Sequence, residues 1–277
     1  MRDRKNGLGH GLSLLIIGVV LIAIGLSLGG QWKTNGFFSN RGYGNWNWKW
    51  NWSENEKWEK DYIQKIEEIS GVIGSDIRKI KIDLKAGSLE ISVGDEPSFR
   101  ISDFEKDTIQ VDISSGTLRV TEKNWRPRFG RNYTPPIVSL VLPKNILFDV
   151  LDIDMGAGSV KGIGLTCESV SLDTGAGSLD FTDSYFEKTD INTGAGRVQF
   201  SGILGKRTNI STGAGSVEMK VNGNEDDYSI EFERGLGSVR VGKNSWSGVG
   251  DGFAGNRNAD KEISISTGVG AVKIDFY

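Results

Sequence analysis

The chain has 277 residues, 38 of them glycine, and a formal charge of −3 at pH 7. Glycine at about twice its usual share indicates many turns, and the slight acidity excludes a polybasic nucleic-acid-binding surface. The only cysteine is Cys167 and the only histidine is His10. These counts exclude a disulfide framework, a Cys/His zinc centre and histidine-assisted nucleophilic catalysis in the main body. We therefore expect no cofactor and no metal.

The first predicted element is a transmembrane helix. Residues 11–30 carry no charge, and at ~1.5 Å per residue such a helix reaches about 30 Å, the thickness of a bilayer core. Arg2, Arg4 and Lys5 precede it, which places the tail at residues 1–10 in the cytoplasm and the main domain outside the cell. A signal peptide cleaved near residues 27–29 is the alternative. The length of the apolar run favours an uncleaved anchor.

Residues 31–76 are predicted to link the span to the main domain. Indoles at alternate positions would face one side of an extended chain, and indole favours the headgroup level of a bilayer. Packing of this face on the globular domain is equally compatible, and stacking on sugars is a weaker third interpretation. The tryptophans concerned are Trp46, Trp48, Trp50 and Trp52.

The end of this linker, residues 53–70, is predicted to be a short amphipathic helix. Ser53 and Glu56 fit a capping box. Apolar residues follow at helical spacing on one face, and we expect that face to cap the end of the next domain. They are Trp58, Tyr62, Ile66 and Ile69.

A Gly-x-Gly turn recurs in the remainder of the chain. Four full copies are spaced 19 residues apart, degenerate copies begin at Gly235 and Gly268, and single-glycine versions occur at Lys85 and Ser114. A nucleotide-binding loop occurs once, before a helix, whereas this turn recurs without one. We therefore interpret the turn as structural. The glycines of the full copies are Gly156, Gly158, Gly175, Gly177, Gly194, Gly196, Gly213 and Gly215.

Aliphatic residues alternate with polar ones on both sides of each turn, as at Leu172 and Leu179. Each copy therefore predicts two half-buried strands hinged at glycine. The equal intervals favour stacked rungs over an antiparallel sandwich. The predicted fold is all-β: a parallel β-helix or β-solenoid with rungs of about 19 residues over residues 77–277, preceded by the transmembrane helix and the capping helix.

The sequence VSLVLPKNILFDVLDIDMGAGSVKG, residues 138–162, and the repeats after it resemble the bacterial "putative adhesin" domain family of unknown function. With a single span in front, the chain is similar to the LiaG-type membrane-anchored members, which occur in cell-envelope stress operons of Gram-positive bacteria. The resemblance covers residues 77–277. It implies the fold and a role in the cell envelope, and it brings no catalytic residue.

Two irregular segments are candidate ligand sites. Residues 243–261 are rich in glycine and carry Trp246 and Phe253; a segment of this length is either functional or disordered. Residues 124–133 combine guanidinium groups, which grip phosphates, with aromatic rings. That combination suits teichoic acid, lipid headgroups or acidic glycans, and a plain surface loop is the alternative. The residues concerned are Trp125, Arg126, Arg128, Phe129, Arg131 and Tyr133.

Asp154 and Asp173 occupy one column of the repeat and would lie ~5 Å apart on adjacent rungs. Such a pair could share a proton or bind a cation, as in a polysaccharide hydrolase or lyase on a parallel β-helix. Asp is also common at turn entrances for structural reasons. We therefore expect a non-enzymatic protein that binds or scaffolds in envelope stress response or adhesion. Its expected partners are the membrane, wall polymer or envelope-stress membrane proteins, and not nucleic acid.

Overall fold

The computed structural model describes residues 66–123 and 135–277. The predicted membrane span and the four tryptophans at 46–52 lie outside the described residues. Within those two ranges, no helix is both long and apolar enough to cross a membrane. The described residues belong to one compact unit, Gln64–Tyr277.

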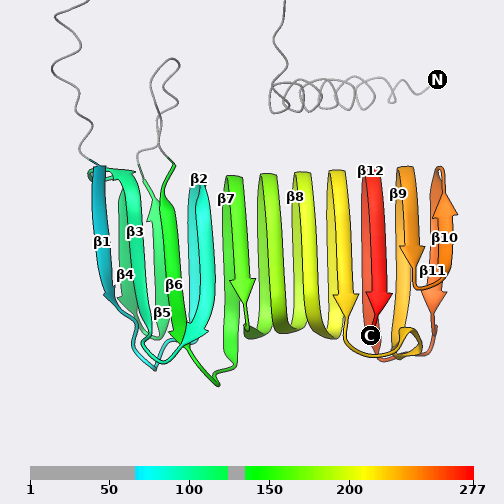
Figure 1. Cartoon of the computed structure of the whole chain (residues 1–277), viewed down its shortest axis with the longest axis horizontal. Coiled ribbons are helices and arrows are strands. Elements are labelled where there is room, and N and C mark those ends of the chain that lie inside the picture. Colours follow the sequence, from blue (N-terminus) through cyan, green and yellow to red (C-terminus); the bar gives the residue numbers. More distant parts are fainter. Residues whose placement is uncertain (1–65, 124–134) are drawn as a thin grey trace, which may run out of the picture. The chain divides into compact units, whose positions relative to one another are not determined.

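The central part of this unit is a stack of rungs, which confirms the predicted all-β, solenoid-like fold (Figure 1). In each rung the chain runs along one side, bends at a glycine turn and returns along the other side. β7 pairs in parallel with the first rung of β8, with Gly158 opposite Gly177. The interval of 19 residues is thus the register of the stack. The strands that make the rungs are β2 (Lys79–Gly94), β7 (Phe148–Ile163), β8 (Thr166–Val221), β9 (Tyr228–Val241) and β12 (Lys261–Phe276).

A continuous apolar core runs along the inside of the stack. Ile153 and Val160 of β7 are buried there, as are Leu172 and Leu179 of β8. Since the side chains of a strand alternate between its two faces, the intervening polar residues point outward. Each rung covers the apolar face of its neighbours, so burial of the core stabilises the whole stack.

The rungs do not follow chain order throughout. β12 lies between β8 and β9, with Ile265 opposite Ile210 on one side and Phe232 on the other. Stacking in chain order, which the repeats predict, is therefore wrong for the last two copies. The physical reason is that the outer side of β9 is already occupied. β10 (Asn244–Ser247) and β11 (Gly250–Gly255) pair antiparallel with that side of β9.

The glycine-rich segment at 243–261 therefore has a structural role at the end of the stack. Its strands β10 and β11 cover β9, and Trp246 packs on Phe232 with ring centroids 4.8 Å apart. Phe253 lies 4.0 Å from the Arg257 guanidinium. The segment is neither an open loop nor a disordered one.

The other end of the stack is built from shorter strands. Two of them replace one rung: β5 (Thr117–Glu122) pairs in parallel with the first half of β2, and β6 (Ile137–Pro143) with the second half. The end of β5 and the start of β6 thus lie at the place where other rungs have the glycine turn. Antiparallel strands complete this end: β4 (Ile109–Ser114) on β5, β3 (Ser98–Glu105) on β6, and β1 (Ile66–Val72) on β3.

The single-glycine motif at Ser114 is not a rung turn, contrary to the sequence prediction. It is the hairpin between β4 and β5, in which Ser114 pairs with Thr117. Ser115 and Gly116 have φ of 50° and 70°, as a tight two-residue hairpin turn requires. The motif at Lys85 does form a rung turn, because Ala86 and Gly87 lie opposite Ala157 and Gly158.

The helix predicted for residues 53–70 is wrong where the structure describes it. Ile66 to Val72 form β1, which pairs with β3. The register shifts between Glu67 and Ile69, and such a bulge changes which face of a strand the following residues use. Spacing of three residues between Ile66 and Ile69 is therefore compatible with a strand as well as a helix. The described sheet begins at Ile66, ahead of the boundary expected at residue 77.

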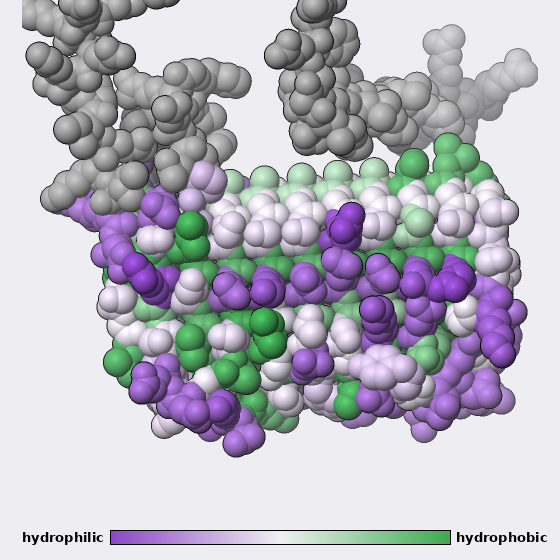
Figure 2. All heavy atoms as spheres, viewed as in Figure 1, coloured by the Kyte–Doolittle hydropathy of each residue, from purple (hydrophilic) through white to green (hydrophobic). Residues whose placement is uncertain are grey.

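The stack has two unlike edges, which we name by their residues. The glycine edge consists of the turns at 85–87, 156–158, 175–177, 194–196, 213–215, 268–270 and 235–237, and Lys85 is the one charged residue in these turns. The loop edge consists of the connections at 163–165, 182–185, 201–205, 222–227 and 256–260, which carry Asp183, Glu225, Asp226, Asp227, Arg257 and Asp260. In Figure 2 the glycine edge is the upper margin, where apolar and neutral atoms gather.

Candidate functional site

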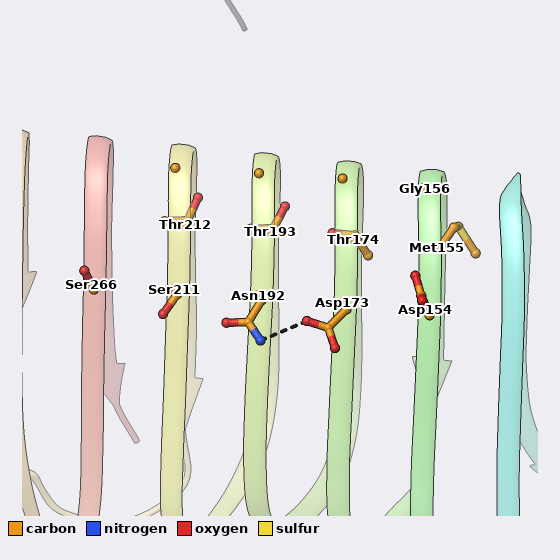
Figure 3. A pocket seen from close by; sticks show the side chains of 13 residues that line it. Asp154, Met155, Gly156, Asp173, Thr174, Asn192, Thr193, Ser211, Thr212 and Ser266 are labelled. Atoms are coloured by element: carbon orange, nitrogen blue, oxygen red, sulfur yellow. Dashed lines mark hydrogen bonds between the residues drawn. The ribbon is translucent and has the colours of Figure 1, made fainter. Parts of the chain in front are cut away.

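A shallow groove runs along the stack beside the glycine edge and crosses five rungs (Figure 3). It encloses about 490 Å³. The residues that lead into each glycine turn line it: Asp154 to Gly156, Asp173 to Gly175, Asn192 to Gly194, Ser211 to Gly213, and Ser266.

One row of side chains in this groove carries the carboxylates considered above. Asp154 lies opposite Asp173, as the repeat predicts, and Asp83 of β2 lies opposite Asp154. Adjacent strands are about 4.8 Å apart, so three carboxylates follow one another along the stack. Sequence reasoning missed Asp83. The sequence does indicate it, because Asp83 stands two residues before the turn residue Lys85, as Asp154 does before Gly156.

Two of these carboxylates have partners of their own. Lys85 Nζ lies 2.8 Å from Asp83 Oδ1. The Asn192 amide donates a hydrogen bond of 2.9 Å to Asp173 Oδ1. The hydrogen bond to Asp83 raises the pKa of Lys85 against the opposing effect of desolvation. The first of these contacts lies within β2, and the second joins two neighbouring rungs.

A second row on the same face repeats this arrangement. Asn209 donates a hydrogen bond of 2.7 Å to Asp190 of the preceding rung. At β2 and β7, Lys81 Nζ lies 3.1 Å from Asp152 Oδ2. Because these pairs recur away from the groove, Asp–Asn and Lys–Asp contacts are a general means of joining rungs in this molecule. They do not single out the groove as a reaction centre.

Metal-binding and nucleophilic chemistry find little support in the described ranges. No group of three or more His, Cys, Asp or Glu side chains in residues 66–123 and 135–277 is placed to hold a metal ion. Cys167 is 1% exposed, and burial raises the pKa of its thiol to about 12. Because the thiolate is the reactive form, this cysteine is inert at neutral pH.

A row of threonines lies on the inner side, beneath the glycine turns. Their hydroxyl oxygens are buried and have no hydrogen-bond partner among the described residues: Thr174, Thr193, Thr212 and Thr267. Arg234 continues this row on β9, where it lies opposite Thr267. The Arg234 guanidinium lies 5.6 Å from the Phe232 ring, and its Nε and Nη1 atoms are also buried without such a partner.

The two glycines of each turn are needed for different reasons. At Gly175, a Cβ would overlap the carbonyl oxygen of Gly156 in the neighbouring rung. At Gly177, a Cβ would overlap the carbonyl oxygen of Gly158, and φ is also 152°, a conformation that other residues resist. Both glycines therefore allow one rung to approach the next.

The remaining predicted site residues lie outside the described residues. They are Trp125, Arg126, Arg128, Phe129, Arg131 and Tyr133, together with the tryptophans at 46–52. The structure does describe the residues that flank the first group. The end of β5 and the start of β6 both lie at the glycine edge, next to the turn of β2.

Comparison with known proteins assigns the chain to a domain family. Among solved structures, a putative cell adhesion protein from Clostridium sporogenes is 13% identical, with a TM-score of 0.47 over 77% of this chain and 100% of that one. A putative adhesin from Bacteroides fragilis is 15% identical, with a TM-score of 0.42 over 76% of this chain and 97% of that one. None of the curated proteins matches the chain. Residues 72–245 match the family model described as Toastrack DUF4097. The chain therefore belongs to the Toastrack DUF4097 family, a domain family of unknown function, as its resemblance to the adhesin-like domains predicts.

Proposed function

We propose that the protein is a membrane-anchored, extracellular module that binds or scaffolds in the cell envelope without catalysing a reaction. The observation that carries this proposal is the combination of a uniform stack of rungs with one variable edge. In repeat proteins, variation between repeats gathers in the loops of one face, which is often the binding face. Here that face is the loop edge.

The connections of the loop edge present different chemistry from rung to rung. Glu187, beside the 182–185 connection, accepts a hydrogen bond from Tyr185, and its carboxylate lies 2.9 Å from Lys206 Nζ. These two contacts lower the pKa of Glu187. The connection at 222–227 contains three consecutive acidic residues at Glu225–Asp227. A surface of this kind suits recognition of a charged envelope partner.

The alternative function is a polysaccharide hydrolase or lyase that uses Asp154 and Asp173 in the groove. A catalytic carboxylate pair needs one member poised to give or take a proton from the substrate. The Asn192 amide already bonds Asp173, and similar contacts join rungs elsewhere. The geometry therefore favours a structural role for this pair.

A complementation experiment tests the proposal. Cells that lack the protein would receive the full chain, a variant with residues 222–227 replaced by glycine and serine, or the double variant Asp154→Asn, Asp173→Asn. Survival under cell-wall stress would be measured with equal protein levels. We expect the loop-edge variant to fail and the double variant to complement. Failure of the double variant alone would favour the enzyme.

The location needs a separate measurement. Protease added to intact protoplasts should digest the domain and leave the first 30 residues with the membrane. Release of a soluble domain that begins near residue 30 would instead indicate a cleaved signal peptide.

A further inference from the structure

We infer that the glycine edge lies against the outer surface of the membrane, so that the rungs stand on the bilayer and the loop edge points away from it. This inference rests on the proposed function, because it takes the chain to be anchored in a membrane. It adds an orientation and a lipid-contacting surface.

Strand directions show where the chain enters the domain. β6 runs away from the glycine edge, because it pairs in parallel with the second half of β2. β3 is antiparallel to β6, and β1 is antiparallel to β3. β1 therefore begins at the glycine edge with Ile66 (Figure 1). Tyr277 lies at the loop edge, where its carbonyl accepts a hydrogen bond of 3.1 Å from Gly223 N.

The sequence before Ile66 limits how far this edge can move from the bilayer. Residues 31–65, a stretch of 35, separate the predicted span from β1. Even when fully extended, a chain of that length spans at most about 115 to 125 Å. Such a tether keeps the glycine edge at high local concentration near lipid, so individually weak contacts are enough to orient the domain.

The chemistry of the edge suits a lipid surface. The middle residue of every turn is aliphatic, and these residues form a straight ridge: Ala157, Ala176, Ala195, Ala214, Val269 and Leu236. At one end of the ridge Val269 is 53% exposed and Leu236 is 63% exposed. Val249, in the turn between β10 and β11, is 73% exposed. Exposed aliphatic patches mark interaction surfaces.

The backbone of the ridge is compatible with partial burial in lipid. The last two residues of each turn belong to the parallel ladder, in which Gly270 lies opposite Gly215 and Gly237, whereas the first glycine, such as Gly268, is left out of the register. Paired backbone groups can approach acyl chains without an unsatisfied hydrogen bond. The carboxylates of Asp154 and Asp173 lie in the groove beside the ridge, at a depth where headgroups and water would still surround them.

A second copy of the chain is the other conceivable occupant of the ridge. A stable dimer needs about 800 Å² of complementary surface from each partner. The ridge is narrow and presents mainly glycine and alanine outside its Val269–Leu236–Val249 end. A membrane needs no complementary shape, and the entry of the chain at this edge favours it.

The test places an environment-sensitive fluorophore on each edge of the full-length chain. Leu236→Cys provides the glycine-edge position and Ile203→Cys, at a residue 40% exposed, the loop-edge control. Cys167 stays unlabelled in the folded protein because it is buried. The protein is reconstituted into phosphatidylcholine vesicles with and without nitroxide-labelled lipid. We expect a blue shift and loss of most emission to the nitroxide at position 236, and neither effect at position 203.

Each other outcome overturns the inference in a distinguishable way. If the chain stays with the vesicles but position 236 is not quenched, the orientation is wrong while the membrane anchor stands. A blue shift at position 236 without nitroxide quenching would mean that protein, such as a second copy, covers the ridge. If the chain does not stay with the vesicles, the anchored function fails together with the inference.

Discussion

The glycine edge and the loop edge differ in how much change the structure tolerates. At the glycine edge every rung turns in the same way, because a Cβ at Gly175 or Gly177 would meet the backbone of the next rung. At the loop edge the turns differ: Asp183 has φ of 52°, Gly164 of 71° and Gly202 of 150°. Close approach of backbone to backbone recurs from rung to rung at the glycine edge, whereas at the loop edge it occurs at single positions, such as Gly202 against the Ser184 carbonyl oxygen. A connection that only has to reverse the direction of the chain can adopt many backbone conformations.

The largest effect should come from insertions. Two residues, Gly-Ser, placed between Gly175 and Ala176 would force one turn out of the ladder, and we expect a loss above about 4 kcal/mol in the free energy of unfolding. The same insertion between Ala259 and Asp260 should cost below about 1 kcal/mol, because loop-closure entropy changes slowly with length. Urea unfolding followed by circular dichroism measures both. Similar losses would contradict the difference between the edges.

Single glycine substitutions should separate backbone strain from overlap with the neighbouring rung. Gly177→Ala meets both, and we expect a loss of about 3 to 5 kcal/mol. Gly248 has φ of 83°, and a Cβ there would meet nothing within 4 Å. Gly248→Ala should therefore cost only the strain, about 1 to 2 kcal/mol. The control is informative because both residues lie in turns at the same edge. Equal losses in urea unfolding would show that contact between rungs contributes little.

A pH experiment tests how well the core is sealed next to the loop edge. Cys167 lies near the start of β8, and burial raises the pKa of its thiol from 9.0 to about 12. The folded protein therefore holds its proton at pH values where the unfolded chain loses it. The resulting stability is full below pH ~9 and is lost as the pH rises toward ~12, by about 1.4 kcal/mol at pH 10.

The variant Cys167→Ala provides the comparison for this pH effect. Between pH 8 and pH 10 the free energy of unfolding of this variant should fall less than that of the unchanged protein, because the variant has no thiol to ionise. This difference does not depend on the stability of the variant at pH 8. Urea unfolding at pH 8 and pH 10 gives, for each protein, the slope of the free energy of unfolding against pH. Identical slopes would mean that water reaches the thiol in the folded state.

The smallest effect is expected beneath the glycine edge. The Thr212 hydroxyl is buried and has no partner among the described residues, so Thr212→Val should stabilise the protein by about 0.5 to 1 kcal/mol. Thr108 is the control, because its hydroxyl donates a hydrogen bond of 2.6 Å to the Glu105 carbonyl. Thr108→Val should destabilise by about 1 kcal/mol. Thermal melts distinguish the signs, and destabilisation by Thr212→Val would reveal a bond to that hydroxyl.

Much of the fold could be predicted from the spacing of Gly156, Gly175 and Gly194, because equal intervals and alternating aliphatic residues specify a repeated rung. The order of the last two rungs could not. β9 and β12 fit the rung pattern equally well, and their order depends on the antiparallel strands that cover β9. The strand at Ile66 was also missed, because a bulge gives its isoleucines a helical spacing.

The groove was predictable only in part. The repeat placed Asp154 beside Asp173, but Asp83 was missed because Lys85 replaces the first glycine of that turn. The contacts of Lys85 and Asn192 depend on side-chain conformation, which no sequence pattern records. The residues of the apolar ridge can be identified in the sequence, because each is the middle residue of a glycine turn. It becomes a surface only once the rungs are stacked.

The position of β12 has a consequence for the order of folding. β12 joins the last rung of β8 to β9, which it follows in the chain, through contacts between residues 55 and 33 positions apart. Until residues 261–276 have been synthesised, both of those strands present unpaired edges that favour association with other chains. Contacts between distant residues also form slowly. During synthesis the rungs from β2 to β8 can assemble as they emerge, whereas β9, β10 and β11 must wait for β12 before they can join the sheet.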